Sequence, residues 1–116
     1  MEIKIVKTPI NKKELIDMAK GQFGNLVKAV VDVSQGIMAV GGEMHADEEV
    51  ALMEQEGSKR EDTWGINLYL EKTGDELIEF DSIINIKPSY GNRSRNVENL
   101  KAKEDIKIIV NKLIVE

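Results

Sequence analysis

The fold is decided by residues 26–40, LVKAVVDVSQGIMAV. Residues 26–33 are largely β-branched and apolar on both faces, with only two charged side chains, which is typical of a central strand. Residues 34–36 have the composition of a turn, and residues 37–40 are apolar again. This pattern predicts a β-hairpin at the centre of a sheet.

Three further strands are predicted from the alternation of side chains around this hairpin. Residues 2–6 place two isoleucines on one face, and residues 64–70 alternate apolar side chains with smaller or polar ones. Residues 78–86 place Ile78, Phe80, Ile84 and Ile86 on one face and Glu79, Asp81 and Asn85 on the other. The pair Gly41-Gly42 is expected to end the second hairpin strand or to form a bulge in it.

Helical signals separate these strands. A capping box formed by Asn11 and Glu14 predicts a helix over residues 12–22. An apolar stripe near the C-terminus predicts a last helix of about 15 residues. Residues 48–56 fit a short helix that ends at Gly57 or, equally by alternation, a strand, and we favour the helix.

The order of these elements predicts an α+β fold of one domain over residues 1–116. We expect a two-layer sandwich, with a mostly antiparallel sheet of about five strands and the first and last helices on one of its faces. The only tryptophan, Trp64, is expected in the core against Ile84 or Ile86 and the last helix. The sequence leaves the strand order and the oligomeric state open.

Composition excludes several classes of protein. The chain has no cysteine, so disulfides and thiol chemistry are excluded. No apolar stretch approaches the roughly 20 residues that span a bilayer, and the N-terminus lacks the pattern of a signal peptide, so a cytoplasmic protein without a membrane partner is predicted. The richness in Glu, Lys and Ile favours a thermophilic source.

The charge distribution argues against a general nucleic-acid binder but allows one local anion site. The net charge is −5 and only 4% of residues are aromatic, whereas nucleic-acid binders present a broad basic face. Residues 87–95 nevertheless carry three basic side chains and no acid. The rest of the chain therefore has a charge of −8.

The segment Gly41-Gly42-Glu43-Met44-His45-Ala46-Asp47 holds the only histidine. In an extended strand Glu43, His45 and Asp47 would share one face, and imidazole and carboxylates are ligands for Zn²⁺ or Mn²⁺. The sequence therefore predicts a divalent metal site at these three residues. The competing interpretation makes Asp47 the N-cap of a following helix and His45 a partly buried, hydrogen-bonded histidine.

The loop from residue 87 to residue 96 is the second polar region. Arginine forks, hydroxyls and glycine-exposed N–H groups are what an anion site needs. We predict ligand-binding roles in and beside this loop for Asn85, Lys87, Ser89, Asn92, Arg93, Ser94 and Arg95. The competing interpretation is a solvated loop that leads into the last helix.

Three blocks of the sequence together resemble a known family. They are the segment 41–47, Asp62-Thr63-Trp64-Gly65, and Ile84-Asn85-Ile86-Lys87-Pro88 with Asn92-Arg93-Ser94. The set resembles a small prokaryotic family of single-domain proteins known only as a domain of unknown function. The resemblance covers nearly the whole chain and implies no established activity, substrate or catalytic residue.

The predicted role is the binding of a small anionic ligand, alone or together with a divalent metal. One alternative is a metal-dependent phosphoester hydrolase, with His45 as base or ligand and Arg93 as charge clamp. The other is a protein-interaction module whose loop pairs with an acidic partner. The first prediction requires the two polar regions to meet in space.

Overall fold

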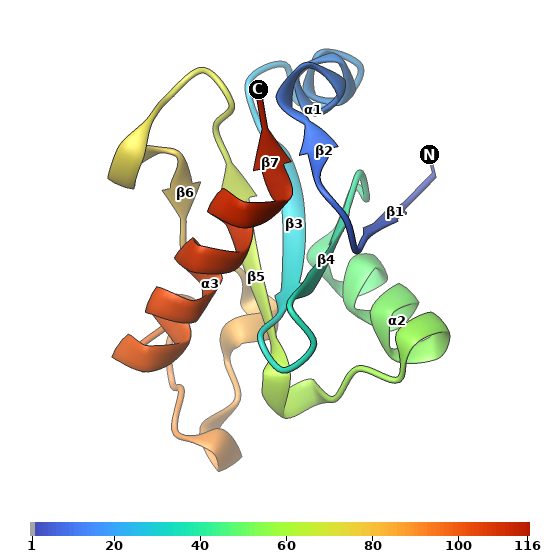
Figure 1. Ribbon diagram of the computed structural model, residues 1–116. Helices are drawn as coiled ribbons and strands as arrows, with labels where there is room; N and C mark the ends of the chain where they lie inside the picture. The colour runs from blue at the N-terminus through green and yellow to red at the C-terminus, as the bar shows by residue number, and fades with distance from the viewer. Residues whose placement is uncertain (1) are drawn as a thin grey trace.

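The computed structural model describes residues 2–116 and has a five-stranded antiparallel sheet with three α-helices (Figure 1). The strand order is β1-β4-β3-β5-β6. These strands are β1 (Lys4–Val6), β3 (Val27–Asp32), β4 (Ile37–Val40), β5 (Thr63–Leu68) and β6 (Ile78–Glu79), and the helices are α1 (Lys12–Lys20), α2 (His45–Glu56) and α3 (Leu100–Leu113). A separate parallel pair joins β2 (Ile10–Asn11) to β7 (Ile114–Val115). The predicted α+β class is confirmed.

The central hairpin is confirmed as β3 and β4. The buried carboxylate of Asp32 closes its turn, because it accepts hydrogen bonds from the backbone N–H groups of Ser34 at 2.8 Å and Gln35 at 3.1 Å. The Ser58 hydroxyl donates to the same carboxylate at 2.6 Å. Gly36 completes the turn with a φ of +70°, a conformation that glycine adopts without strain.

The two faces of the sheet are covered by different helices. The larger core cluster joins alternate residues of β3 with side chains of α1 and α3, such as Leu15 and Ile106, so the first and last helices share a face as predicted. Leu52 of α2 packs with Val30 and Ala39 in a second cluster. Helix α2 therefore covers the opposite face, and Figure 1 shows α3 in front of the sheet.

The helical predictions hold, with shifts at the ends. Asn11 caps α1, since its side chain accepts from the N–H of Lys13 at 2.8 Å. Residues 48–56 are helical, as favoured, but α2 already begins at His45. It ends at Gly57, which has the left-handed conformation expected of a C-terminal glycine. Helix α3 begins after Asn99, whose side chain accepts from the N–H of Ala102 at 3.0 Å.

The prediction of a strand over residues 78–86 is wrong beyond Glu79. Strand β6 pairs only with Asn67 and Leu68 of β5, and the chain then leaves the sheet for the 3₁₀ helix η3 (Ile83–Asn85). Ile86 is consequently exposed, and Ile84 belongs to the α2 side of the sheet. Trp64 is buried in the cluster on the α3 side, as predicted, whereas Ile84 packs in the other cluster, so the expected packing of Trp64 against Ile84 is not formed.

A side chain takes the place of the missing strand at the edge of β5. The Asn85 amide accepts from the Gly65 N–H at 2.8 Å and donates to the Gly65 carbonyl at 2.9 Å, as a neighbouring strand would. Further along the edge, the Lys87 ammonium donates to the Thr63 carbonyl at 2.6 Å. The edge of β5 is thus closed by β6, Asn85 and Lys87 in turn.

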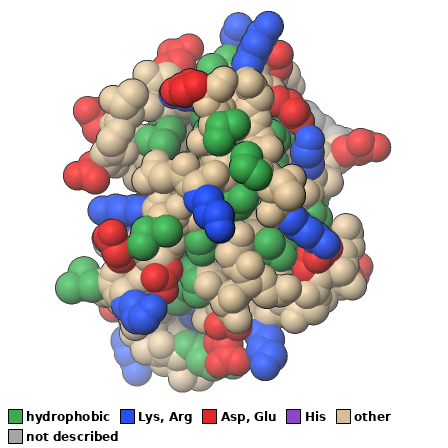
Figure 2. Space-filling model, viewed as in Figure 1, with side chains coloured by type: hydrophobic (Ala, Val, Ile, Leu, Met, Phe, Trp, Pro, Cys, Tyr) green, Lys and Arg blue, Asp and Glu red, His purple; other side chains and the backbone are tan. Residues whose placement is uncertain are grey.

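Within residues 2–116, the helices are all too short or too polar to cross a membrane. On the face that carries α3, acidic and basic side chains of the described residues are interspersed, and no broad basic area is visible (Figure 2).

Candidate functional site

The predicted metal ligands do not converge. The extended geometry on which that prediction rested is wrong, because α2 begins at His45 and the three residues do not alternate along a strand. Glu43 and Asp47 are exposed, whereas His45 is half-buried. Among residues 2–116 there is no group of three or more His, Cys, Asp or Glu side chains that could hold a metal ion. Asp47 is not the N-cap either, since that position is Met44.

The start of α2 is fixed instead by the fully buried Glu48. Its carboxylate accepts from the Gly42 N–H at 2.9 Å, while Oε1 has no hydrogen-bond partner in the described chain. A Cβ atom at residue 42 would lie 2.7 Å from Glu48 Cγ, which explains the glycine. Burial raises the pKa of Glu48 well above its usual range.

This burial gives the free energy of unfolding a pH dependence with a defined sign. A group whose folded pKa is raised stabilises the fold at low pH, and this contribution is lost as pH rises from about 4.5, its ordinary value, towards the folded pKa. We expect Glu48→Gln to gain stability relative to wild type over that range, measured by urea denaturation between about pH 4.5 and 8. Asp47→Asn, which removes an exposed charge from the same turn, is the control. Parallel curves for wild type and Glu48→Gln would contradict the expectation.

His45 presents a defined tautomer. Its Nε2 lies 2.8 Å from the Ile66 carbonyl oxygen, which can only accept, so Nε2 carries the hydrogen. Burial is the main cause that lowers the His45 pKa, with further lowering by Lys28 and Arg95, so the ring is neutral at pH 7. Nδ1 is then an acceptor, and no group of the described chain donates to it.

Three of the predicted loop ligands are buried inside the fold. Asn85 and Lys87 close the edge of β5, as described above. The Asn92 amide donates to the carbonyls of Asn85, Ser94 and Asn96 at 2.7–3.0 Å and accepts from the Glu98 N–H at 2.8 Å. These side chains hold the loop in shape, so they are not free to bind a ligand.

The other loop residues are exposed but do not form one cluster. The Ser94 hydroxyl donates to Glu98 at 2.7 Å, as does the Arg93 backbone N–H at 2.9 Å. Ser89 and the Arg93 side chain are exposed. Arg95 forms an ion pair with Asp81, Nε to Oδ1, at 2.6 Å. Of the seven residues, only Arg95 lines a pocket with part of the segment 41–47.

His45 and Arg95 meet in what we call the α2 pocket, a cavity of about 250 Å³ on the α2 side of the sheet. It is lined by Lys28, Met44, His45, Ala46, Asn67, Asp81, Ser82, Ile83, Ile84 and Arg95. With His45 neutral, the lining carries two positive charges and one negative charge, a net +1 on a chain of −5. The two polar regions of the sequence therefore both reach this pocket, the first through Met44, His45 and Ala46 and the second through Arg95 alone.

The structure adds residues that the sequence did not single out. Lys28 and Asn67 are direct partners in the pairing of β3 with β5, and both side chains line the pocket. Asn67 is buried, and its Oδ1 has no hydrogen-bond partner in the described chain. The charge of Lys28 inside an apolar strand was the one available signal, because a strand interior seldom carries an unpaired lysine.

Comparison with known families assigns the chain to one of them. A family model described as protein of unknown function, DUF5674, matches residues 4–113. The chain belongs to this family. The match confirms the predicted membership of a family of unknown function, and the family brings no activity or site residues. Neither the curated proteins nor the solved structures contain a match to this chain.

Proposed function

We propose that the chain binds a small anionic ligand in the α2 pocket. The observation that carries this proposal is the position of Lys28 and Arg95 around the first turn of α2. Helix α2 has 12 residues, and its N-cap residue, Met44, makes no side-chain cap hydrogen bond. The N-terminal end of the helix dipole and its free N–H groups therefore favour an anion at the residues Met44, His45 and Ala46, which line the pocket.

Arg95 has donors to spare for such a ligand. Its ion pair with Asp81 uses Nε, and the described chain offers no further partner to its two terminal nitrogens. Those nitrogens suit a planar carboxylate or a phosphate oxygen pair. Lys28 lies over the ring of Phe23 at 5.0 Å and has no carboxylate partner in the described residues, so its charge is also available.

The size and the walls of the pocket indicate the scale of the ligand. A volume of about 250 Å³ is below the usual range of about 300–1,000 Å³ for drug-sized ligands, so a small metabolite-like anion fits better than a nucleotide. Met44, Ile83 and Ile84 supply an apolar wall beside the charges. Few charges and some apolar surface are what a small organic anion needs.

Titration with inorganic phosphate and with propionate tests the proposal. We expect amide NMR signals of His45 and Ala46 to shift at low salt and to shift less as salt rises, because partly exposed charges are screened within about 10 Å at 0.1 M. Arg95→Ala and Lys28→Ala should each weaken binding by about 5- to 10-fold and leave the fold intact.

Arg93→Ala is the matched control, because Arg93 is an exposed arginine of the same loop that does not line the pocket. Binding that weakens equally in Arg93→Ala and Arg95→Ala would place the anion on the loop surface instead. Unmoved signals at His45 and Ala46 would contradict the proposal outright.

A further inference from the structure

We infer that the ligand of the α2 pocket carries a hydrogen-bond donor beside its anionic group, as small hydroxy and amino carboxylic acids do. This inference rests on the proposed function. It is carried by acceptors on two residues of the pocket lining that receive no hydrogen bond from the described chain: Asn67 Oδ1, which is closed to solvent, and His45 Nδ1.

The orientation of the Asn67 amide is fixed by its partners. Nδ2 donates to Glu79 Oε1 at 2.8 Å and to the Asp81 carbonyl at 3.5 Å. Both partners can only accept, so the nitrogen must face them, and the oxygen lies on the other side of the amide. Asn67 is only 9% exposed, and its oxygen is closed to solvent without a donor. An unpaired acceptor of this kind costs stability unless a donor arrives.

The imidazole of His45 adds a second acceptor. Because Nε2 donates to the Ile66 carbonyl, Nδ1 holds a lone pair whenever the ring is neutral. A bare carboxylate or phosphate oxygen placed against Nδ1 or Asn67 Oδ1 would set two lone pairs against each other. An O–H or N–H group on the atom next to the anionic group would satisfy these acceptors while Arg95 and Lys28 hold the charge.

A ligand reaches the closed oxygen of Asn67 only when side chains of the pocket wall move. Three of the ten lining residues, Lys28, Met44 and Arg95, have long, flexible side chains. Met44 is 58% exposed and can change rotamer at little cost, whereas Arg95 stays paired with Asp81 and keeps its terminal nitrogens for the anion. The site is therefore specific for an anion that brings a donor with it.

Lactate and propionate form the matched pair of probes, since both are carboxylates of three carbons and differ by one hydroxyl. At about pH 8 His45 is neutral and both acids are ionised. We expect NMR titration of the wild type to show lactate binding at least about 5-fold more tightly than propionate, which is the worth of one hydrogen bond to an unpaired acceptor. The ¹⁵N signal of His45 Nδ1 should move with lactate and not with propionate.

Variants assign the preference to its acceptor. Asn67→Ala should reduce the preference for lactate to below about 2-fold. Glu79→Gln removes the charge but keeps an acceptor for Asn67 Nδ2, so the amide keeps its orientation and the preference should remain. Should Asn67→Ala fail to fold, the comparison of the two acids on wild type and the Nδ1 signal still decide the matter.

The outcomes separate the two claims. If neither acid binds at the α2 pocket, the proposed function fails and this inference fails with it. If both acids bind there equally, the proposed function stands and the inference is overturned. A lactate preference that survives in Asn67→Ala, with an unmoved Nδ1 signal, also overturns it, because neither acceptor would then carry the discrimination.

Discussion

Replacing Asn85 with alanine is expected to destabilise the fold by about 3–5 kcal/mol. The side chain is fully buried and satisfies three backbone groups, the N–H and the carbonyl of Gly65 and the carbonyl of Arg95. Alanine leaves all three unpaired at the edge of the central part of the sheet. Each buried unpaired group costs about 1–3 kcal/mol, and some water entry reduces the sum.

Urea denaturation followed by circular dichroism measures this loss. Asn111→Ala is the control, because Asn111 is an exposed asparagine on α3 and should change stability by no more than about 0.5 kcal/mol. Asn85→Asp is informative as well, because it keeps an acceptor for the Gly65 N–H but loses both donated bonds. A loss in Asn85→Ala as small as that in Asn111→Ala would mean that the loop does not close the edge of β5.

The same edge shows why the structural role of the loop was not predicted from the sequence. Asn85, Lys87 and Asn92 have the side chains of an anion site, and the i, i+2 spacing of Asn85 and Lys87 continues the strand alternation. The partners of Asn85 and Lys87 include Gly65 N–H and Thr63 O, which lie at least 20 residues earlier in the chain, whereas Asn92 bonds backbone groups of its own loop. Composition cannot distinguish a polar side chain that binds a ligand from one that replaces a strand, because both need the same donors and acceptors.

The elements themselves were predictable where apolar periodicity was strong. The β3–β4 hairpin, α1 and α3 follow from it, and α2 was recovered in spite of a weak pattern because Gly57 marks its end. The predicted strand over residues 78–86 is longer than β6 because Ile84 and Ile86 continue the alternation of apolar and polar side chains. Alternation says nothing about whether a partner strand is present, and η3 pairs with β5 through a side chain instead.

Only some residues of the candidate site could be predicted from the sequence. His45 and Arg95 lie within the two polar regions that stood out, and both line the α2 pocket. Lys28 and Asn67 join them through the register of β3 against β5, which a single sequence does not specify. The extended geometry expected for the metal ligands is not formed, because an extended segment and the first turn of a helix place alternate side chains differently.

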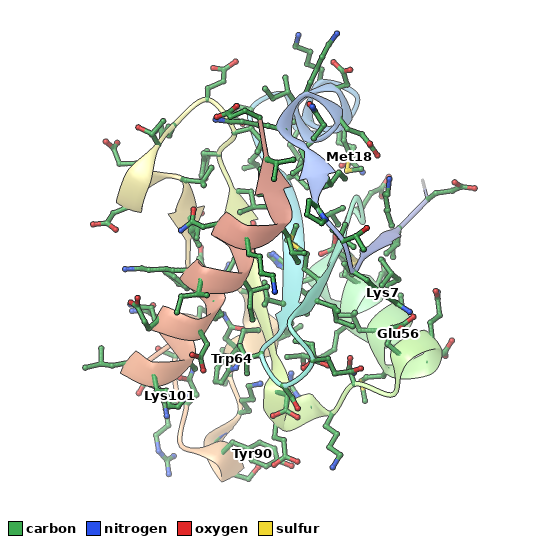
Figure 3. The ribbon with its side chains drawn as sticks, viewed as in Figure 1. Lys7, Met18, Glu56, Trp64, Tyr90 and Lys101 are labelled. Atoms are coloured by element: carbon green, nitrogen blue, oxygen red, sulfur yellow. The ribbon has the colours of Figure 1, made fainter. Side chains whose placement is uncertain are left out.

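Replacing Trp64 with alanine is expected to destabilise the fold by about 3–5 kcal/mol, chiefly through the cavity left in the core. Trp64 is 5% exposed and belongs to the cluster that includes Ile106 and Val110 of α3. Figure 3 shows it behind α3, with Tyr90 and Lys101 farther out. Together with these two residues it lines a groove of about 520 Å³, so the truncation opens the core to that groove.

The ring of Trp64 also contacts the ammonium group of Lys87. The Lys87 ammonium lies 3.7 Å from the ring centroid and is almost fully buried, and burial lowers the Lys87 pKa to about 8. A cation on a desolvated ring is stabilised by about 2 kcal/mol. Trp64→Ala and Lys87→Met should therefore be non-additive, with a coupling energy of about 1–2 kcal/mol in a double-mutant cycle. Urea denaturation followed by circular dichroism suits these variants, because Trp64 is the only tryptophan.

The pH dependence of the free energy of unfolding separates two effects of Trp64→Ala, the changed environment of Lys87 and the cavity in the core. A lysine whose folded pKa is about 8 and whose ordinary value is 10.5 holds fewer protons in the folded chain than in the unfolded one between these values. The free energy of unfolding should therefore rise as pH increases from about 8 to about 10. Loss of the ring contact lowers the Lys87 pKa, and water that enters through the cavity of Trp64→Ala raises it. Because desolvation is the largest cause of the lowered pKa, we expect the water to dominate and this rise in the free energy of unfolding to be smaller in the variant. Trp64→Phe keeps an aromatic face over Lys87 and should keep most of it. An equal rise in wild type and Trp64→Ala would show that the ring does not shield Lys87 from water.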